Sequence, residues 1–560
     1  MKKIILLTLL IGFTSIFAQA AKDPRQAVFQ VTTYQKDGTV LHTGNGFLVG
    51  SNGTGVAPYS LFRDAYRAEI TDSKGKKHAV GRILGANSAS DVVKFTIDDA
   101  KSMAPLSVAT QMPSSGARVY YPTAGKSGAA TTATTVSKAS PYNDYQYYEL
   151  AAPNRAELFG LPLLNANGDV VAIIQENVAR NASSACALDA RFVQSLTISS
   201  VSALNDELNH IHIAKALPET EADATAFLYF LNPSDSLVTA TMLHDYVARY
   251  PNNAEGYMNR ASFFAQHTDY ARANDDYATA LSIAEKNTAG VRPEDVHYQL
   301  SRTMFNTVNV QRPTSYWSLD RAAEEAAAAY RINPNPVYLN QQARCLYAQN
   351  KFSDAYRLYM QVNQSPIASA ETYFDAAQAL DATHTDSAGV LTLLDSCVVR
   401  LEKPYSVGAA QYVFARAQYE MKMGKYRAAV NDLNEYEKAL GPSNLSAQFY
   451  YLRMQCEKAA RMYQQALSDI MYAQTIASRN QAFEYGIEEA LLLMQVGMYE
   501  DVIAKARQLV DQRPDDADCH KILGIAYGET KQRAKALDHL NKARALGDTT
   551  ADTYIKRYNK

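Results

Sequence analysis

The sequence predicts a chain of two unlike parts, an all-β domain near the amino terminus and an all-α array of repeats after it. The first part contains short apolar stretches separated by glycine and asparagine, without amphipathic helices between them. In the second part, small and aromatic residues recur at the spacing of paired helices, and no strand pattern returns. The chain has 560 residues, more than one hydrophobic core usually holds, so we expect at least two domains.

The composition is that of an ordinary globular protein, with 47% hydrophobic and 20% charged residues. The 55 basic and 57 acidic residues give a net charge of −2, which provides no basic surface for nucleic acid. No nucleic-acid partner, cofactor or metal is expected.

The first 20 residues have the pattern of a signal peptide. Met1-Lys2-Lys3 is followed by an apolar run over 4–17 and by Ala18-Gln19-Ala20, after which cleavage is expected. The alternative is a membrane anchor, for which the run is short compared with the roughly 20 residues that a bilayer requires. No second long apolar stretch follows, so we expect an exported chain without a membrane span, periplasmic or secreted.

Five cysteines are few for an exported chain, and none forms a C-x-x-C pair. Buried thiols are the favoured interpretation, and a bridge between Cys345 and Cys397 is left open.

Residues 21–200 alternate with the short period of strands, and a turn pattern stands at Asn52-Gly53. Such strands, with no helices between them, indicate a β-sandwich or barrel. The expected strands cover 28–34, 44–49, 78–84, 92–97, 117–121, 147–151 and 170–175.

Four segments in this domain together resemble trypsin-like serine proteases of the bacterial periplasmic type, over about 25–196. They are GNGFLVGSNG at 44–53, SASDVV at 88–93, GLPLLNANGDVVA at 160–172 and ACALD at 185–189. The resemblance implies a double β-barrel with a catalytic triad.

The triad positions are degenerate. The resemblance places Ser60 at the histidine position, Asp91 at the aspartate position and Phe159 at the nucleophile position. A phenyl ring cannot attack a carbonyl, and a serine hydroxyl does not accept a proton near neutral pH as imidazole does. The sequence therefore predicts a pseudoprotease.

Other residues do not rebuild the site in this interpretation. Glu157 replaces the glycine whose amide helps to bind the oxyanion. His42 and His78, the only histidines of the domain, belong to strands, and Cys186 has no recognisable base. We expect Asp91 to cap nearby amides and Phe159 to plug the emptied cleft.

A helical linker is expected over 201–218, because Val201, Leu204, Leu208 and Ile211 have helical spacing. His210 and His212, two residues apart, would point away from each other on a helix, so no metal site is expected there.

The repeat pattern of the helical part, 219–560, is clearest in its last unit. Its pattern is His520-x-x-Leu523-Gly524-x-x-Tyr527 followed by Ala536, Leu540 and Ala543. This spacing resembles the tetratricopeptide repeat (TPR), in which small residues let two short helices approach closely. We expect about eight units, insertions near 287–314 and 384–404, and a carboxy-terminal capping helix.

Most tyrosines of the array, including Tyr426, Tyr463 and Tyr499, are expected to pack between helices. Stacked pairs would curve into a superhelix whose concave face accepts a peptide or a partner helix.

The sequence thus predicts an exported, non-catalytic scaffold or adaptor, with the pseudoprotease domain as a second docking surface. Two alternatives remain: an active serine-type peptidase with a rearranged site, and a chaperone-like holder of unfolded clients.

Overall fold

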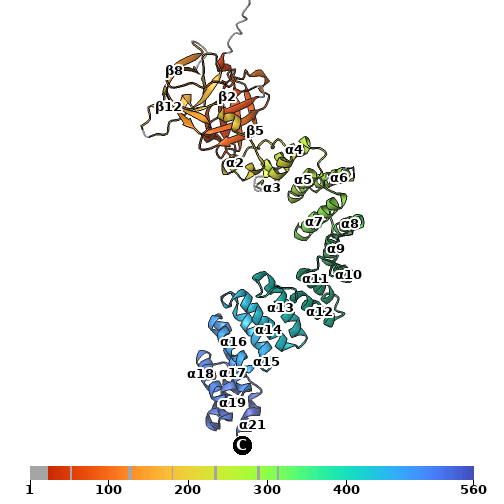
Figure 1. Cartoon of the computed structure of the whole chain (residues 1–560). Coiled ribbons are helices and arrows are strands. Elements are labelled where there is room, and N and C mark those ends of the chain that lie inside the picture. Colours follow the sequence, from red (N-terminus) through yellow and green to blue (C-terminus); the bar gives the residue numbers. More distant parts are fainter. Residues whose placement is uncertain are drawn as a thin grey trace, which may run out of the picture. The chain divides into compact units, whose positions relative to one another are not determined.

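The computed structural model describes residues 23–50, 53–123, 129–179, 181–231, 236–286, 290–311 and 314–559. They divide into two compact units, Met1–Arg292 and Pro293–Lys560. The first unit contains all the strands and the helices up to α6, and the second contains α7 to α21 (Figure 1). The expected signal peptide, 1–20, lies outside the described residues.

The strands form two closed six-stranded barrels. The first barrel has the order β1-β2-β3-β6-β5-β4 and the second β10-β11-β12-β9-β8-β7, which is the same order when counted from β7. With the helices that follow, this confirms the predicted fold class of a double barrel and an α solenoid. The strands are β1 (Val28–Tyr34), β2 (Val40–Val49), β3 (Thr54–Ala57), β4 (Arg67–Thr71), β5 (Lys77–Asn87), β6 (Val92–Ile97), β7 (Arg118–Pro122), β8 (Thr131–Tyr142), β9 (Tyr145–Pro153), β10 (Pro162–Leu164), β11 (Val170–Gln175) and β12 (Ser184–Asp189).

Apolar alternation explains how each barrel fills its interior. In β1, Phe29 and Val31 are buried and Gln30 between them is exposed, as a half-buried strand requires. A further cluster joins the two barrels and contains Phe47 and Val92 of the first with Ile173 and Leu188 of the second. Because β11 takes part in both the barrel interior and this cluster, all six of its residues are buried.

The segment after the second barrel differs from the helical linker expected over 201–218. After α1 (Phe192–Ser195) it contains η5 (Ser200–Leu204) and α2 (Asp206–Asn209), and then joins β5 as an extended chain. The Ile83 amide donates to the Ala214 carbonyl (2.9 Å), and the Ala216 amide donates back to the Ile83 carbonyl (2.8 Å). The backbone of 214–216 therefore bonds to β5 and not within a helix. The apolar residues at Leu208 and Ile211 belong to the packing of the barrel and not to a long linker helix.

The same segment completes the core of the first barrel. Leu208 and Ile211 are 3% and 0% exposed within it, whereas Leu204 is 61% exposed. Arg82 of β5 also holds Asp245 of α4 through two hydrogen bonds of 2.5 and 2.9 Å. The β-domain and the first helices are therefore packed together.

The helical part consists of antiparallel hairpins. Within the described residues, eight hairpins run from α5/α6 to α19/α20, with α3 and α4 before them and α21 after them. The helices are α3 (Glu221–Tyr229), α4 (Ser236–Arg249), α5 (Ala254–Gln266), α6 (Tyr270–Lys286), α7 (Pro293–Gln311), α8 (Leu319–Ile332), α9 (Pro336–Ala348), α10 (Phe352–Val362), α11 (Ala370–Asp381), α12 (Ser387–Val398), α13 (Val407–Lys422), α14 (Tyr426–Leu440), α15 (Ala447–Ala459), α16 (Tyr463–Ile476), α17 (Arg479–Gln495), α18 (Tyr499–Gln512), α19 (Ala517–Glu529), α20 (Arg533–Ala545) and α21 (Ala551–Tyr558).

A recurring turn connects the two helices of a hairpin. In α13/α14, Gly424 has a φ of 72°, and the following Lys425 amide donates to the Glu420 carbonyl (2.8 Å). This closes the first helix as a Schellman motif, which needs a left-handed residue. The equivalent left-handed residues of other hairpins are Thr268, Asn350, Arg461, Gly497 and Lys531.

Two stretches expected to be insertions are helices. Residues 287–314 contain α7, which buries Val296, Leu300 and Met304 on one face, and 384–404 contain α12. Both lack the small-residue spacing of the last unit, so a search for that spacing passes over them. Apolar residues four apart are enough to pack a helix against its neighbours.

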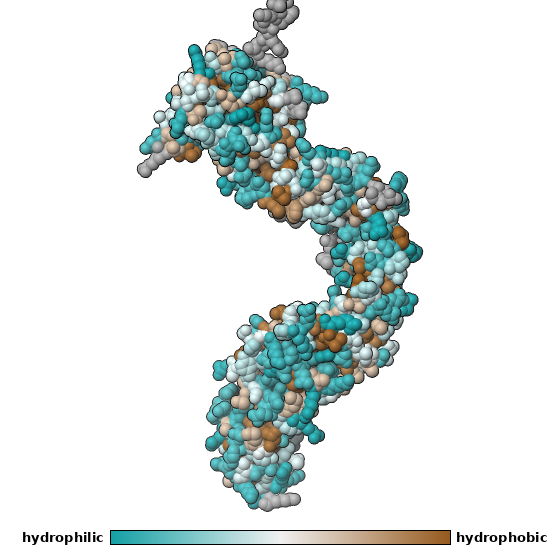
Figure 2. Space-filling model, in the orientation of Figure 1, coloured by the Kyte–Doolittle hydropathy of each residue, from teal (hydrophilic) through white to brown (hydrophobic). Residues whose placement is uncertain are grey.

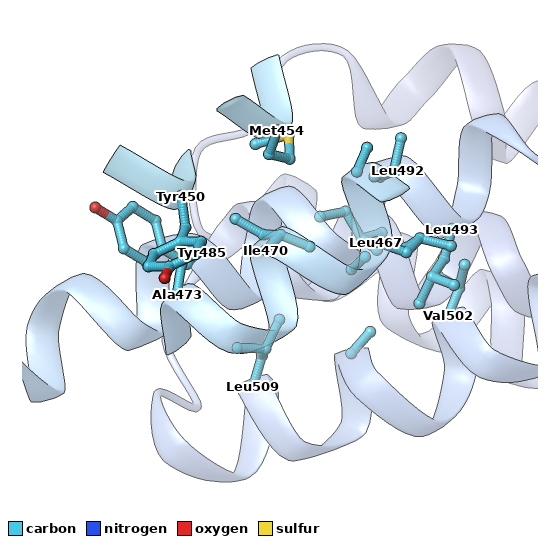
Figure 3. Packing of buried hydrophobic residues seen from close by; sticks show 14 of the residues in the cluster. Tyr450, Met454, Leu467, Ile470, Ala473, Tyr485, Leu492, Leu493, Val502 and Leu509 are labelled. Atoms are coloured by element: carbon cyan, nitrogen blue, oxygen red, sulfur yellow. The ribbon is translucent and has the colours of Figure 1, made fainter. Parts of the chain in front are cut away.

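The packing of the array combines small residues with large ones. One cluster that includes α15 to α18 contains Tyr450, Met454, Ile470, Leu493 and Val502 (Figure 3). In the last hairpin, a Cβ on Gly524 would lie 2.7 Å from Cγ of Leu540, so the close approach requires glycine as expected. Tyr426 differs from the expectation, since it is 37% exposed, and Tyr463 and Tyr499 are only half-buried.

Buried ion pairs recur inside the hairpins at a fixed spacing of 16 residues. Arg260 pairs with Asp276, Arg416 with Asp432 and Arg453 with Asp469, each through two hydrogen bonds of 2.7–2.9 Å. In α17/α18 the charges are exchanged between the helices, with Glu489 on the first and Lys505 on the second. Among the described residues, no helix is both long and apolar enough to cross a membrane.

We predict that Leu208→Ala and Ile211→Ala will each destabilise the first barrel by about 2–5 kcal/mol, because each leaves a cavity in its core. The measurement is hydrogen exchange of the β1–β6 amides in the full chain. The matched control is Leu204→Ala, whose side chain is exposed and whose effect should stay within about 0.5 kcal/mol. Equal effects of all three changes would contradict the assignment of this segment to the barrel.

Candidate functional site

The structure brings together two of the three residues at the triad positions. Ser60 lies in η2 (Tyr59–Leu61) after β3, and Asp91 lies in the turn between β5 and β6. The Ser60 amide donates to Asp91 Oδ1 (2.7 Å), and the Ser60 hydroxyl donates to Asp91 Oδ2 (3.2 Å). Both carboxylate oxygens of Asp91 therefore cap η2, which is the role that the sequence suggested for Asp91.

The turn that carries Asp91 is fixed by the second barrel. Asp91 has a positive φ of 43°, a conformation that a non-glycine residue adopts only with support from its surroundings. Ser90, next to it, shares a hydrogen bond of 2.8 Å with the Tyr142 hydroxyl, and Gln175 of β11 donates to the Ser90 carbonyl. Sequence reasoning missed this support, because the hydrogen bonds join residues that are 52 and 85 positions apart.

Phe159 follows η4 (Ala156–Leu158) in the loop before β10. The Asn45 side-chain amide of β2 donates to the carbonyls of Glu157 and Phe159, each at 3.1 Å. The Phe159 side chain is half-buried, so it is not the fully packed plug that the sequence suggested.

Glycine at 160 allows this loop to touch the first barrel. Gly160 has a φ of 83°, and a Cβ there would lie 2.2 Å from the Asn45 carbonyl oxygen and 2.9 Å from Pro58. Since Pro58 is two residues before Ser60, the loop containing Phe159 lies beside the Ser60–Asp91 pair.

The backbone at Phe159 does not offer a free amide for an oxyanion. In acyl transfer, amides near the nucleophile must point at the developing negative charge. Here the Phe159 amide donates to the Ala156 carbonyl (3.2 Å), and the Leu158 amide donates to the Arg155 carbonyl (3.0 Å). The turn itself uses these donors.

In the part of the chain that the structure describes, neither His42 nor His78 forms a hydrogen bond with Ser60 or Asp91. His42 is exposed on β2. His78 is buried on β5, where its ring nitrogens lie 3.3 Å from Asp72 Oδ2 and from the Asp98 carbonyl.

His210 and His212 have separate partners, Asp64 at 2.9 Å and the stacked ring of Tyr66 at 4.1 Å. Across the described ranges, no group of three or more histidine, cysteine or acidic residues is placed to hold a metal ion.

Cys186 is a buried thiol, as expected from the sequence. It is 2% exposed in β12, its sulfur lies 2.7 Å from the Tyr147 hydroxyl, and burial raises its pKa. A thiol with a raised pKa is a poor nucleophile because little of it is thiolate. Cys345 and Cys397 are also free and buried, so the possible bridge between them is absent.

One further segment flanks the Ser60–Asp91 pair. The Tyr59 hydroxyl donates to the Glu207 carbonyl (3.1 Å), and the Ser88 hydroxyl donates to the Glu207 carboxylate (2.7 Å). Tyr59 and Ser88 are close in sequence to Ser60 and Asp91, so α2 covers one side of this site.

Within the described residues, two of the hollows of the helical part lie beside aromatic side chains. One, of about 420 Å³, is at the start of α14 and includes Tyr426, Lys425 and Arg427. The other, of about 350 Å³, lies among α13, α14 and α15 and is lined by Phe414, Tyr436, Asn444, Leu445, Ser446, Gln448, Phe449 and Leu452.

Comparisons with known proteins find similarity only to solved structures, and at low sequence identity. No protein-family model and no curated protein matches the chain. The chain is similar to the crystal structure of Rv3671c from M. tuberculosis H37Rv, a serine-to-alanine mutant in an inactive form, at 17% identity over 31% of this chain and 85% of that chain, with a TM-score of 0.25. It is also similar to the active form of the Rv3671c protease from M. tuberculosis, at 17% identity over 35% and 85%, with a TM-score of 0.27. Both TM-scores are low, so the description of the barrels depends on their own strand order.

We predict that Gly160→Ala destabilises the second barrel by at least about 1 kcal/mol more than Gly168→Ala does, because only the former adds overpacking to backbone strain. Both glycines have a positive φ, but a Cβ on Gly168 would meet nothing within 4 Å. Gly168→Ala should cost about 1–2 kcal/mol from the left-handed backbone alone. Hydrogen exchange of the β10 and β11 amides measures the difference, and equal losses would contradict the tight contact between residue 160 and Asn45.

Proposed function

We propose that this chain is a non-catalytic scaffold or adaptor that binds other proteins through its helical array. The observation that carries the proposal is the use of the catalytic positions for structural bonds. Ser60 and Asp91 bond to each other, and the Phe159 amide bonds to the Ala156 carbonyl. A nucleophile, its base and a free oxyanion donor are what acyl transfer requires.

The helical part is proposed to be a TPR-like array. Its support is the repetition of short hairpins with the same left-handed turn and with small buried residues at equivalent places. In α5 and α6, for example, Ala261, Ala273 and Ala280 are 0% exposed. A stacked array of this kind presents an extended concave surface to a peptide or a partner helix.

Two features support protein binding by this array. On the face seen in Figure 2, brown hydrophobic patches interrupt the teal polar surface of the helical part. The hollow lined by Phe414, Tyr436 and Phe449 offers aromatic rings beside the polar groups of Asn444 and Gln448, a combination typical of recognition surfaces.

The β-domain is proposed to be a second docking surface, joined to the start of the array. Arg82 and Asp245 connect it to α4, and Phe227 of α3 packs with Ala203 and Ala214. A partner bound to the β-domain would therefore be held next to the first helices. Export to the periplasm or the medium is part of the proposal and depends on the pattern of residues 1–20.

We expect the full chain to remain unlabelled by a fluorophosphonate probe and to cleave no peptide substrate with turnover. The sharper test restores the triad residues in the double variant Ser60→His, Phe159→Ser. Any turnover of this variant should be at least about 10²–10³ below that of an intact serine-protease site, because the amide at 159 is engaged by the Ala156 carbonyl and one oxyanion donor is therefore missing. Labelling of the unaltered chain that disappears on changing one residue would support a peptidase with a rearranged site instead.

A pull-down with the full chain from envelope extract is expected to recover one discrete partner in a fixed ratio. A holder of unfolded chains would instead recover many proteins, and would bind chemically denatured clients in competition with one another. The comparison variant is the same chain with Phe449→Ala and Tyr436→Ala, which removes two of the three aromatic rings of the hollow. A partner that is retained at the same ratio would exclude this hollow as the binding surface.

A further inference from the structure

Two successive hairpins contain the same buried cluster of one arginine and two acids. In α13/α14 it consists of Arg416, Glu420 and Asp432, and in α15/α16 it consists of Arg453, Glu457 and Asp469. The two acids are 7% and 6% exposed in the first cluster, and 3% and 7% in the second. Each residue of the second cluster follows its counterpart by 37 positions, so the clusters occupy equivalent places.

Each arginine is already committed to other acids. Nε and Nη2 of Arg416 bond to Asp432, and its Nη1 bonds to Asp395 of α12 at 3.1 Å. Arg453 repeats this arrangement with Asp469, and its Nη1 bonds to Glu437 of α14 at 2.6 Å. All three nitrogens of each guanidinium thus point to carboxylates other than the glutamate on the same helix.

Glu420 and Glu457 are left without a hydrogen-bond partner at one oxygen. Within the residues that the structure describes, Oε2 of each is buried and unpaired. A carboxylate that is buried without its own counter-ion is costly, and the group becomes neutral instead.

The acidic groups around each glutamate strengthen this effect, and the basic groups oppose it. Burial, with the neighbouring Asp432 and in spite of Arg416, raises the pKa of Glu420 to about 7, and Asp395 and Lys425 also face it. Burial, with Asp469 and in spite of Arg453, raises the pKa of Glu457 to about 8, and Glu437 faces it from α14. The adjacent Cys456 stays a thiol near neutral pH, since burial raises its pKa to about 11.

We propose that these two clusters form a proton-operated switch in the middle of the solenoid. With Glu420 and Glu457 protonated, α13 to α16 pack tightly and each cluster contains a neutral acid beside an Arg–Asp pair. When the protons are lost, two buried negative charges without counter-ions loosen these hairpins. The segment α13 to α16 is therefore more rigid in mildly acidic surroundings than in mildly alkaline ones.

The other hairpins show that an acid is not needed at this position for packing. In α5/α6, the pair Arg260–Asp276 has Phe264 at the place of the two glutamates, four residues after the arginine. In α17/α18 the pair Glu489–Lys505 has Leu493 there. Apolar residues fill the same place in hairpins with the same ion-pair spacing.

The direction of the pH effect follows from proton binding. The folded pKa of each glutamate is above the ordinary value of 4.5, so the folded chain holds more protons than the unfolded chain above that pH. The contribution of these two glutamates to stability is therefore greatest at and below about pH 5, falls as the pH rises, and levels off once the pH passes the raised pKa values. Each group changes the opening equilibrium by up to about tenfold per pH unit in this window.

The test is hydrogen exchange of the α13–α16 amides in the full chain at pH 5.5 and 7.5, corrected for intrinsic exchange. In the unaltered chain, the opening constant should rise at least about 10-fold between the two values. The double variant Glu420→Gln, Glu457→Gln should lose most of this rise, because the amide cannot ionise. Glu500→Gln, the same change at an exposed position of α18, should retain it.

A second variant guards against poor folding of the first. Glu457→Leu copies Leu493 of the next hairpin and should also reduce the rise. An opening constant that rises equally in the double variant and in the unaltered chain would overturn the proposal. So would a rise that Glu500→Gln removes as fully as the double variant does.

Discussion

A helical hairpin cannot cover its own apolar face, so the hairpins within each compact unit need a neighbouring element that covers it. Small residues such as Ala261, Gly524 and Ala536 are buried where helices approach, and in the last hairpin the Leu540 side chain lies against Gly524. At the amino-terminal side, the β-domain supplies the cover through Ala203, Ala214 and the Arg82–Asp245 pair. At the other end, α21 covers the last hairpin, with the Tyr558 ring against Gly528. The barrels thus have a structural use that does not require chemistry.

Ser60, Asp91 and Phe159, the residues that the sequence resemblance assigns to a triad, all belong to segments held by structural hydrogen bonds. Asp91 accepts two hydrogen bonds from Ser60, so its carboxylate stabilises η2 where a triad would need it to orient an imidazole. The Asn45 amide holds the carbonyls at 157 and 159, and the 3₁₀ turn consumes the Phe159 amide. The bonds that position this loop are the ones that an oxyanion site would have to break.

The buried ion pairs place polar chemistry inside an otherwise apolar array. Losing one partner of such a pair leaves an uncompensated charge, which costs about 3–5 kcal/mol. The pairs therefore specify which faces of two helices meet. Arg416 and Arg453 also reach back to the preceding hairpin through Asp395 and Glu437, so they connect neighbouring repeats as well as helices within one. Glu420 and Glu457 add a charge that the arginines do not balance, which makes the same place sensitive to pH.

The sequence by itself determined the two-part architecture, most of the strands and the hairpins with small residues, and it predicted Ser60, Asp91 and Phe159 as the triad positions. These follow from local periodicity and from residue type, which are readable along the chain. Only the tertiary structure decided that 206–216 completes the first barrel, that α7 and α12 are helices of the array, and that the Phe159 amide is engaged. It also decided which carboxylates bond to the buried Arg416 and Arg453. The reason is physical: burial and hydrogen bonding depend on which distant segments meet, and the same apolar spacing serves a helix, a barrel edge or a hairpin core.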